Sequence, residues 1–192
     1  MFTAKNYEHL LSTAGFSDTL LKNHFTLYEG YVKNTNGVLE KLEALAKEEK
    51  RATGEYAELK RRFGWEWDGM RMHELYFGNM KNGGGVFDEE STLGKKITAQ
   101  WGSFDEWAKG FKATGAMRGI GWVVLAHDKE SDRLFNVWVN EHDTGHLVGT
   151  TPLLVMDVFE HAFMLDYGIK RADYITAFWN AVDWSIVEQR LA

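Results

Sequence analysis

The stretch TPLLVMDVFEH at residues 151–161 decides how this chain folds. Pro152, the only proline, begins an apolar run over residues 153–156, which indicates a strand. Asp157 ends that run, and His161 follows four residues later. A carboxylate and an imidazole at this spacing, directly after a buried strand, can converge on one ion. The stretch therefore predicts both a strand and part of a metal site.

Two further strands are predicted upstream of this stretch. The runs at 122–126 and 134–139 are rich in β-branched and aromatic residues, and a polar turn at 127–133 separates them. This pattern is typical of an antiparallel hairpin. Ser103 and Glu106 form a capping-box pattern that opens a helix through about residue 117. The last stretch, residues 171–191, has a helical pattern again.

The first half of the chain is helical in pattern. After a plausible N-cap at Ser17, apolar residues recur at helix spacing, and His24 lies on their face. A second helix is expected over about 57–80, with His73 on its apolar side. Gly64 and Gly69 should weaken or bend that helix.

Three consecutive glycines at residues 83–85 mark the most probable break between the two halves. Only helices are predicted before this break, whereas strands and further helices are predicted after it. We therefore expect an α+β protein with a helical domain at residues 1–83 and an α/β domain at residues 84–192.

Composition narrows the class of protein. The chain has 192 residues, of which 44% are hydrophobic and 14% aromatic, so a folded globular protein is favoured over disorder. No window reaches the run of about 18 apolar residues that a membrane span needs. The first 16 residues lack the pattern of a signal peptide. These features predict a cytoplasmic protein that does not act at a membrane.

The absence of cysteine excludes disulfides, thiolate metal sites and cysteine nucleophiles. Histidine and carboxylate are then the only strong metal ligands in the chain. A formal net charge of −6 argues against general nucleic-acid binding, which needs clustered basic residues. It does not exclude an anionic substrate, because local charge near a cleft acts at short range.

Two inward-facing histidines on separate helices, His24 and His73, join Asp157 and His161 as a set of three imidazoles and one carboxylate. Such a set suits a first-row metal and leaves one coordination position open. A single histidine on an apolar helix face is more often a hydrogen-bonded core residue than a metal ligand. Spacing alone therefore leaves both interpretations open.

The segment DVFEHAF at 157–163 closely resembles the signature of iron/manganese superoxide dismutases, in which a tryptophan usually precedes the Glu-His pair. Further segments resemble that family in the family's order. They are HELYF at 73–77, GSFDEWAKGF at 102–111, GIGWVVLAHD at 119–128, TPLL at 151–154 and KRADYITAFWNAVDW at 170–184. With His24 included, the resemblance spans nearly the whole chain.

The resemblance implies a fold and an activity. A helical hairpin would pack against a C-terminal half with a three-stranded antiparallel sheet and helices, and the metal would lie between them. The implied enzyme disproportionates superoxide to oxygen and hydrogen peroxide by cycling one iron or manganese per subunit between +3 and +2. Iron, or the use of either metal, is favoured, and the subunit is expected to form a homodimer, with a tetramer as the alternative.

The resemblance also assigns residues to the site. It implies that His24, His73, Asp157 and His161 are the metal ligands, with water or hydroxide as the fifth. His142 stands where the family has a Gln or a His that hydrogen-bonds the bound solvent, and Gly69 fits that arrangement. His142 is favoured over His146, which follows four residues later.

Other implied roles lie farther from the metal. Tyr31 resembles the family's gateway tyrosine and Tyr28 the residue beside it, although seven residues, not eight, separate His24 from Tyr31. Arg171 matches an arginine that steers superoxide, and Glu160 a residue that reaches the metal-bound histidine of the other subunit. Three aromatic residues would keep the site dry, and core packing explains them equally well: Phe77, Trp122 and Phe159.

Two positions depart from the family pattern. Met164 replaces a tyrosine that hydrogen-bonds across the interface, and Val155 is neither the Gly of manganese members nor the Thr of iron members. Two other functions are considered. One is a catalytically inactive, superoxide-dismutase-like structural or binding protein, and the other is a metal hydrolase with His142 as general base.

Overall fold

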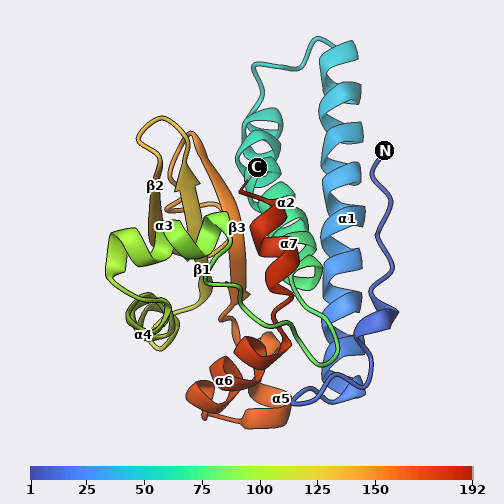
Figure 1. Cartoon of the computed structure of the whole chain (residues 1–192). Helices are drawn as coiled ribbons and strands as arrows, with labels where there is room; N and C mark the ends of the chain where they lie inside the picture. The colour runs from blue at the N-terminus through green and yellow to red at the C-terminus, as the bar shows by residue number, and fades with distance from the viewer. Residues whose placement is uncertain (192) are drawn as a thin grey trace.

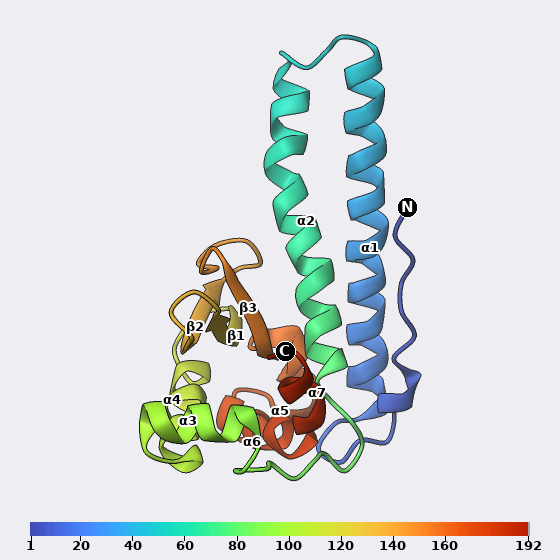
Figure 2. The same cartoon turned by 45° about the horizontal axis from the view of Figure 1, so that its top comes forward.

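Two long helices form the N-terminal half of the molecule, which a computed structural model describes over residues 1–191. Helix α1 (Asp18–Lys47) and helix α2 (Gly54–Gly78) lie side by side, and their connection extends away from the C-terminal half (Figures 1 and 2). The predicted cap is confirmed, since the Ser17 hydroxyl accepts a hydrogen bond from the Leu20 backbone N–H at 3.1 Å.

Helix α2 begins earlier than predicted and runs without interruption through Gly64 and Gly69. Its start is set by Thr53, whose hydroxyl accepts from the Tyr56 N–H. Packing against α1 along its length outweighs the weak helix propensity of the two glycines. The two glycines therefore do not interrupt the helix.

The C-terminal half begins with two helices, α3 (Thr92–Trp101) and α4 (Phe104–Gly115), followed by a sheet. Strands β1 (Gly121–Asp128), β2 (Arg133–Asn140) and β3 (Thr150–Asp157) pair antiparallel in the order β2-β1-β3. The predicted hairpin, third strand and helix after Ser103 are confirmed. Helix α3 was not predicted from the sequence, although the Ser91 hydroxyl caps it by accepting from the Gly94 N–H.

Short helical segments complete the chain: η1 (Glu8–Leu10) at the start, then η2 (Glu160–Ala162), α5 (Met164–Tyr167), α6 (Arg171–Ala181) and α7 (Trp184–Gln189) after the sheet. The helical pattern predicted over 171–191 is confirmed, although it is divided into two helices, α6 and α7. Val182 is extended, and the Asp183 side chain starts α7 by accepting from the Ser185 N–H. Within residues 1–191, no helix combines the length and the apolar character that a membrane span requires.

Hydrogen bonds from one end of α2 join the two halves. The buried Asn79 side chain accepts from the Val155 N–H at 2.8 Å and from Arg190 at 3.2 Å. Arg190 also donates to the carbonyls of Leu75 and Leu153, at 3.0 and 2.8 Å. These contacts place the C-terminal end of α2 against β3. The α+β class is confirmed, while the boundary between residues 83 and 84 stays a prediction.

Candidate metal centre

Four side chains from four elements meet between the two halves. They come from α1, α2, the end of β3 and η2, and one ligand atom of each lies within 4.8 Å of all the others. We call this set the Asp157 cluster: His24, His73, Asp157 and His161. The first three are fully buried, and the His161 side chain is 24% exposed. The structure thus brings together the four residues that the family resemblance implies as metal ligands.

The Asp157 carboxylate lies at the centre of the cluster. Its Oδ2 atom is 3.1 Å from His161 Nε2, 3.2 Å from His24 Nε2 and 3.8 Å from His73 Nε2. Its Oδ1 atom accepts from the Phe159 N–H at 2.8 Å, which fixes the orientation of the carboxylate. Burial alone would raise the pKa of Asp157, but the neighbouring His161 and His24 hold it well below its usual range. The cluster therefore contains a buried anion.

His73 shows that the cluster fits a metal ion. Its Nδ1–H donates to the Gly69 carbonyl at 2.6 Å, so in the neutral ring Nε2 carries a lone pair. Burial, and then His24, hold the pKa of His73 well below its ordinary value, so the ring is neutral. That Nε2 atom is buried and has no hydrogen-bond partner. A buried acceptor directed at a carboxylate is costly unless a cation lies between them.

A hydrogen-bond chain lies beside the cluster. The Trp122 indole N–H donates to His142 Nδ1 at 3.1 Å, so the proton of the neutral His142 ring is on Nε2. That Nε2–H donates to the Tyr31 hydroxyl at 2.7 Å. Burial lowers the pKa of His142 to about 4 and raises that of Tyr31. The Tyr31 hydroxyl proton is then left for another acceptor.

Tyr31 reaches His142 despite the shorter interval from His24. Seven residues are nearly two helical turns, so both side chains leave the same face of α1. The Tyr31 ring stacks on His73 with centroids 5.1 Å apart. It also fills the space beside Gly69, because a Cβ atom there would lie 2.5 Å from the ring. Gly69 is thus required by the position of Tyr31.

Aromatic rings surround the cluster as the sequence predicted. Phe77 lies 4.8 Å from His24, Trp122 lies 5.0 Å from His73 and Phe159 lies 5.2 Å from His161, each measured between ring centroids. All three aromatic side chains are buried. They keep bulk water away from the donor atoms, which strengthens electrostatic interactions there.

Sequence reasoning missed three aromatic residues around the site. Trp65 lies 4.5 Å from the His142 ring, and the Tyr174 hydroxyl donates to the Asp157 carbonyl at 2.5 Å. Tyr76 packs against His24 with centroids 5.3 Å apart. A signal existed for Trp65, which precedes His73 by eight residues and so shares its side of the helix.

Two predicted residues have their polar groups engaged elsewhere. The Tyr28 hydroxyl donates to Glu74 Oε1 at 3.1 Å, although the ring packs beside His73. Arg171 donates to the carbonyls of Met117 and Gly119 at 2.6 and 2.8 Å. A catalytic role for Tyr28 and a steering role for Arg171 remain predictions.

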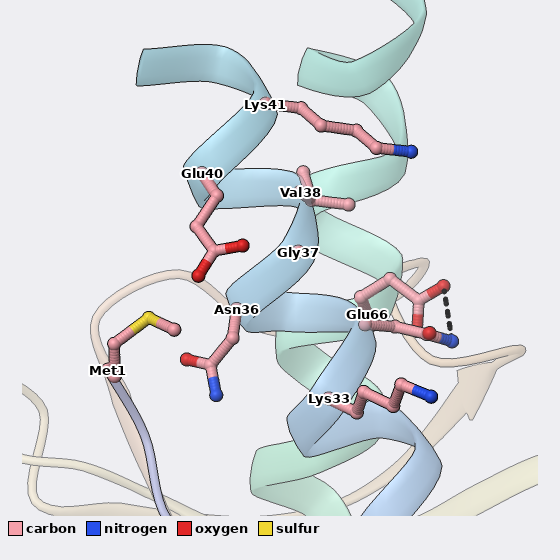
Figure 3. A pocket seen from close by; sticks show the side chains of 9 residues that line it. Met1, Lys33, Asn36, Gly37, Val38, Glu40, Lys41 and Glu66 are labelled. Carbon is pink, nitrogen blue, oxygen red and sulfur yellow. Dashed lines mark hydrogen bonds between the residues drawn. The ribbon is translucent and has the colours of Figure 1, made fainter. Parts of the chain in front are cut away.

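Hollows on the surface differ in their relation to the cluster. One of about 620 Å³ contains His161 in its wall, beside Glu160, Leu27 and Met164. Another of about 540 Å³ lies along α1 between Met1 and Glu66, and no member of the Asp157 cluster lines it (Figure 3). The hollow beside His161 is therefore the one that bears on the site.

Comparison with known proteins adds independent findings. Residues 89–190 match the family model for the C-terminal domain of iron/manganese superoxide dismutases. A superoxide dismutase [Fe] of Saccharolobus solfataricus is 36% identical over 168 residues, which cover 85% of this chain and 79% of that protein. Superoxide dismutase [Mn] 2 of Haloferax volcanii is 37% identical over 165 residues, 84% of this chain and 79% of that protein. A superoxide dismutase [Fe] of Aquifex pyrophilus is 36% identical over 181 residues, with shares of 92% and 84%.

Proposed function

The chain belongs to the iron/manganese superoxide dismutase family, and we propose that the Asp157 cluster holds its redox metal. The protein is a superoxide dismutase, which converts two superoxide anions and two protons to dioxygen and hydrogen peroxide. The single observation that carries the proposed ligand set is the buried, unpartnered Nε2 of His73, which faces Asp157 together with two other imidazoles.

The ligand set matches the charge that the reaction needs. A bound iron or manganese would supply the redox chemistry, in which one electron is taken from one superoxide and passed to the next. Three neutral imidazoles and one carboxylate lower the charge of a trivalent ion without cancelling it. The burial of these side chains keeps bulk water away from the ligand atoms.

We propose that Tyr31 and His142 orient protons for the half of the reaction that reduces superoxide to hydrogen peroxide. His142 Nε2–H is committed to the Tyr31 oxygen, so the Tyr31 hydroxyl hydrogen is free to point toward the substrate side of the cluster. The pKa of Tyr31 is raised by burial, so the hydroxyl stays protonated at neutral pH. We also propose that Arg171 attracts superoxide toward the site, because its positive charge lies near the chain segment that follows η2.

For the metal, we propose iron or the use of either metal. The relatives described above include both iron and manganese enzymes. Metal analysis of protein purified from its native source, and activity after reconstitution with each metal, test this proposal. Activity with manganese alone contradicts it.

For the assembly, we propose a homodimer, with a tetramer as the alternative. The hollow beside His161 is bordered by Glu160 and by the exposed apolar Met164 and Leu165, which are 47% and 58% exposed. In a dimer, Glu160 would orient His161 of the other subunit. Size-exclusion chromatography at low concentration tests this, and a stable monomer contradicts the role of Glu160.

A pair of variants tests the function itself. We expect His161→Ala to lose superoxide consumption and metal, because one of four donor atoms is removed. His9→Ala, at an exposed position outside the cluster, is the control and should keep both. Metal content and the rate of superoxide consumption are the measurements. Absence of a redox metal in the unmodified protein, or an unchanged rate in His161→Ala, overturns the assignment.

A further inference from the structure

The side chain of His142 depends on an irregular loop for its position. The loop over residues 141–149 joins β2 to β3, and it begins with Glu141 in the left-handed region at φ 54°. Asn140 and Thr144 close a tight turn around His142, with N–H···O distances of 2.7 and 3.3 Å. Since no regular element carries His142, other contacts must hold it against Tyr31.

His146 supplies such a contact from within the same loop. Its Nε2–H donates to the backbone carbonyl of His142 at 2.8 Å. The same nitrogen lies 3.8 Å from Oδ2 of Asp68, which belongs to α2. Asp68 directly precedes Gly69, whose carbonyl holds His73. His146 thus connects the backbone that carries His142 to the helix that carries His73.

Burial and charge support this connection. The Asp68 side chain is 29% exposed and that of His146 is 36% exposed, so both are partly shielded from water. Burial raises the pKa of Asp68 and the nearby Asp143 raises it further, whereas His146 acts in the opposite direction. His146 also lines a small hollow of about 90 Å³ together with residues of the sheet such as Val124 and Val137.

We propose that His146 and Asp68 are positioning residues that hold the His142 backbone so that its Nε2–H meets the Tyr31 hydroxyl. Neither belongs to the Asp157 cluster. This inference rests on the proposed role of His142. It goes beyond that role because it assigns a function to two residues outside both the Asp157 cluster and the Tyr31–His142 pair. Loss of the contact loosens His142 and slows turnover while the metal stays bound.

A double-mutant cycle tests the proposal. Superoxide consumption by rapid mixing, metal content and thermal unfolding are measured for His146→Ala and His146→Gln, each in the unmodified chain and in the His142→Ala background. We expect His146→Ala to lower kcat by about 3- to 10-fold, the loss of one hydrogen bond, at full metal content. His146→Gln keeps an N–H donor, so it should recover most of the rate. In the His142→Ala background, His146→Ala should have no further effect.

A matched pair of variants tests the role of the Asp68 charge. Asp68→Asn and Asp143→Asn each remove one negative charge from the same region, but only Asp68 lies within ion-pair distance of His146 Nε2. We expect Asp68→Asn alone to lower kcat. Equal effects of both variants overturn the assignment of Asp68, because they indicate a general effect of charge.

The remaining outcomes separate this inference from the proposed function. An unchanged rate in His142→Ala overturns the proposed role of His142 itself. A reduced rate in His142→Ala with an unchanged rate in His146→Ala overturns only the positioning role. An equal loss from His146→Ala in both backgrounds also overturns it, since His146 would then act on the fold and not through His142.

Discussion

Histidine–aspartate contacts at two places in this molecule have nearly the same length and different surroundings. At the metal centre, His24 and His161 lie 3.2 and 3.1 Å from Asp157, and in the β1–β2 turn, His127 lies 3.0 Å from Asp132. The Asp157 side chain is fully buried among three imidazoles. The Asp132 side chain is 66% exposed and also contacts the Lys96 ammonium.

The difference shows what makes a histidine–carboxylate contact into a metal site. Water and Lys96 already balance the charge of Asp132, so nothing remains for a cation to neutralise. Asp157 has no Lys or Arg within ion-pair distance among residues 1–191, and the lone pair of His73 points at it. Asp157 is buried, has no fixed cation beside it and is surrounded by several ligand atoms that point toward it. These properties together distinguish it from Asp132.

The largest effect is expected from removing the charge of Asp157. Asp157→Asn should lower metal affinity more than about 100-fold, since even partners outside the ligand set are worth 10- to 100-fold. Asp132→Asn makes the same chemical change at the exposed contact and should keep full metal content. Metal per chain after dialysis against a chelator measures both. Equal metal loss in the two variants would break the comparison.

The next effect concerns the pH dependence of stability. Burial lowers the pKa of His142 to about 4, from 6.5, so below about pH 6.5 the unfolded chain takes up a proton that the folded chain refuses. The free energy of unfolding should therefore decrease as the pH falls from 6.5 toward 4, by about 3 kcal/mol in total. His142→Gln should remove this decrease. Urea unfolding of both proteins between pH 7 and 4 measures the difference, and parallel curves contradict the prediction.

A smaller effect is expected at Gly69, where the Tyr31 ring packs against α2. Gly69→Ala places a Cβ 2.5 Å from the Tyr31 ring and should destabilise the fold by about 1–3 kcal/mol, as overpacking does. It should also lower activity by displacing Tyr31. Gly64→Ala in the same helix meets nothing within 4 Å and should stabilise the fold by about 0.5–1 kcal/mol. Thermal unfolding of the two variants should therefore shift in opposite directions.

The smallest effect is expected at the exposed contact. Asp132→Asn removes a partner of both Lys96 and His127, but exposed ion pairs contribute little. The melting temperature should change less than it does in Gly69→Ala, and superoxide consumption should stay the same. A loss of activity here would show that the β1–β2 turn influences the distant metal centre.

The centre of the site could be predicted because its residues carry local signals. His24 and His73 lie on apolar helix faces, and Asp157 ends an apolar strand that His161 follows within one turn. Periodicity and strand length place such side chains inward without knowledge of the tertiary structure. The resemblance to the family then chose between a metal site and an ordinary core.

The surrounding contacts could not be predicted because they depend on partners far away in the sequence. The Asn79 amide pairs with the Val155 N–H across 76 residues, and the Tyr174 hydroxyl reaches the Asp157 carbonyl. The engagement of Tyr28 with Glu74 is of the same kind. The break between α6 and α7 was missed because Asp183 acts as a helix cap inside an apolar pattern.

The distance along the chain between ligands has a consequence for how the protein acquires its metal. His24 and Asp157 are 133 residues apart, whereas the α1–α2 pair and the β1–β2 hairpin each close through short connections. Loop-closure entropy makes such local units form early and the contact between His24 and Asp157 form late. The atoms of the proposed ligand set therefore converge only as the two halves dock. We expect the metal content of the protein to depend on which ions are present while it folds.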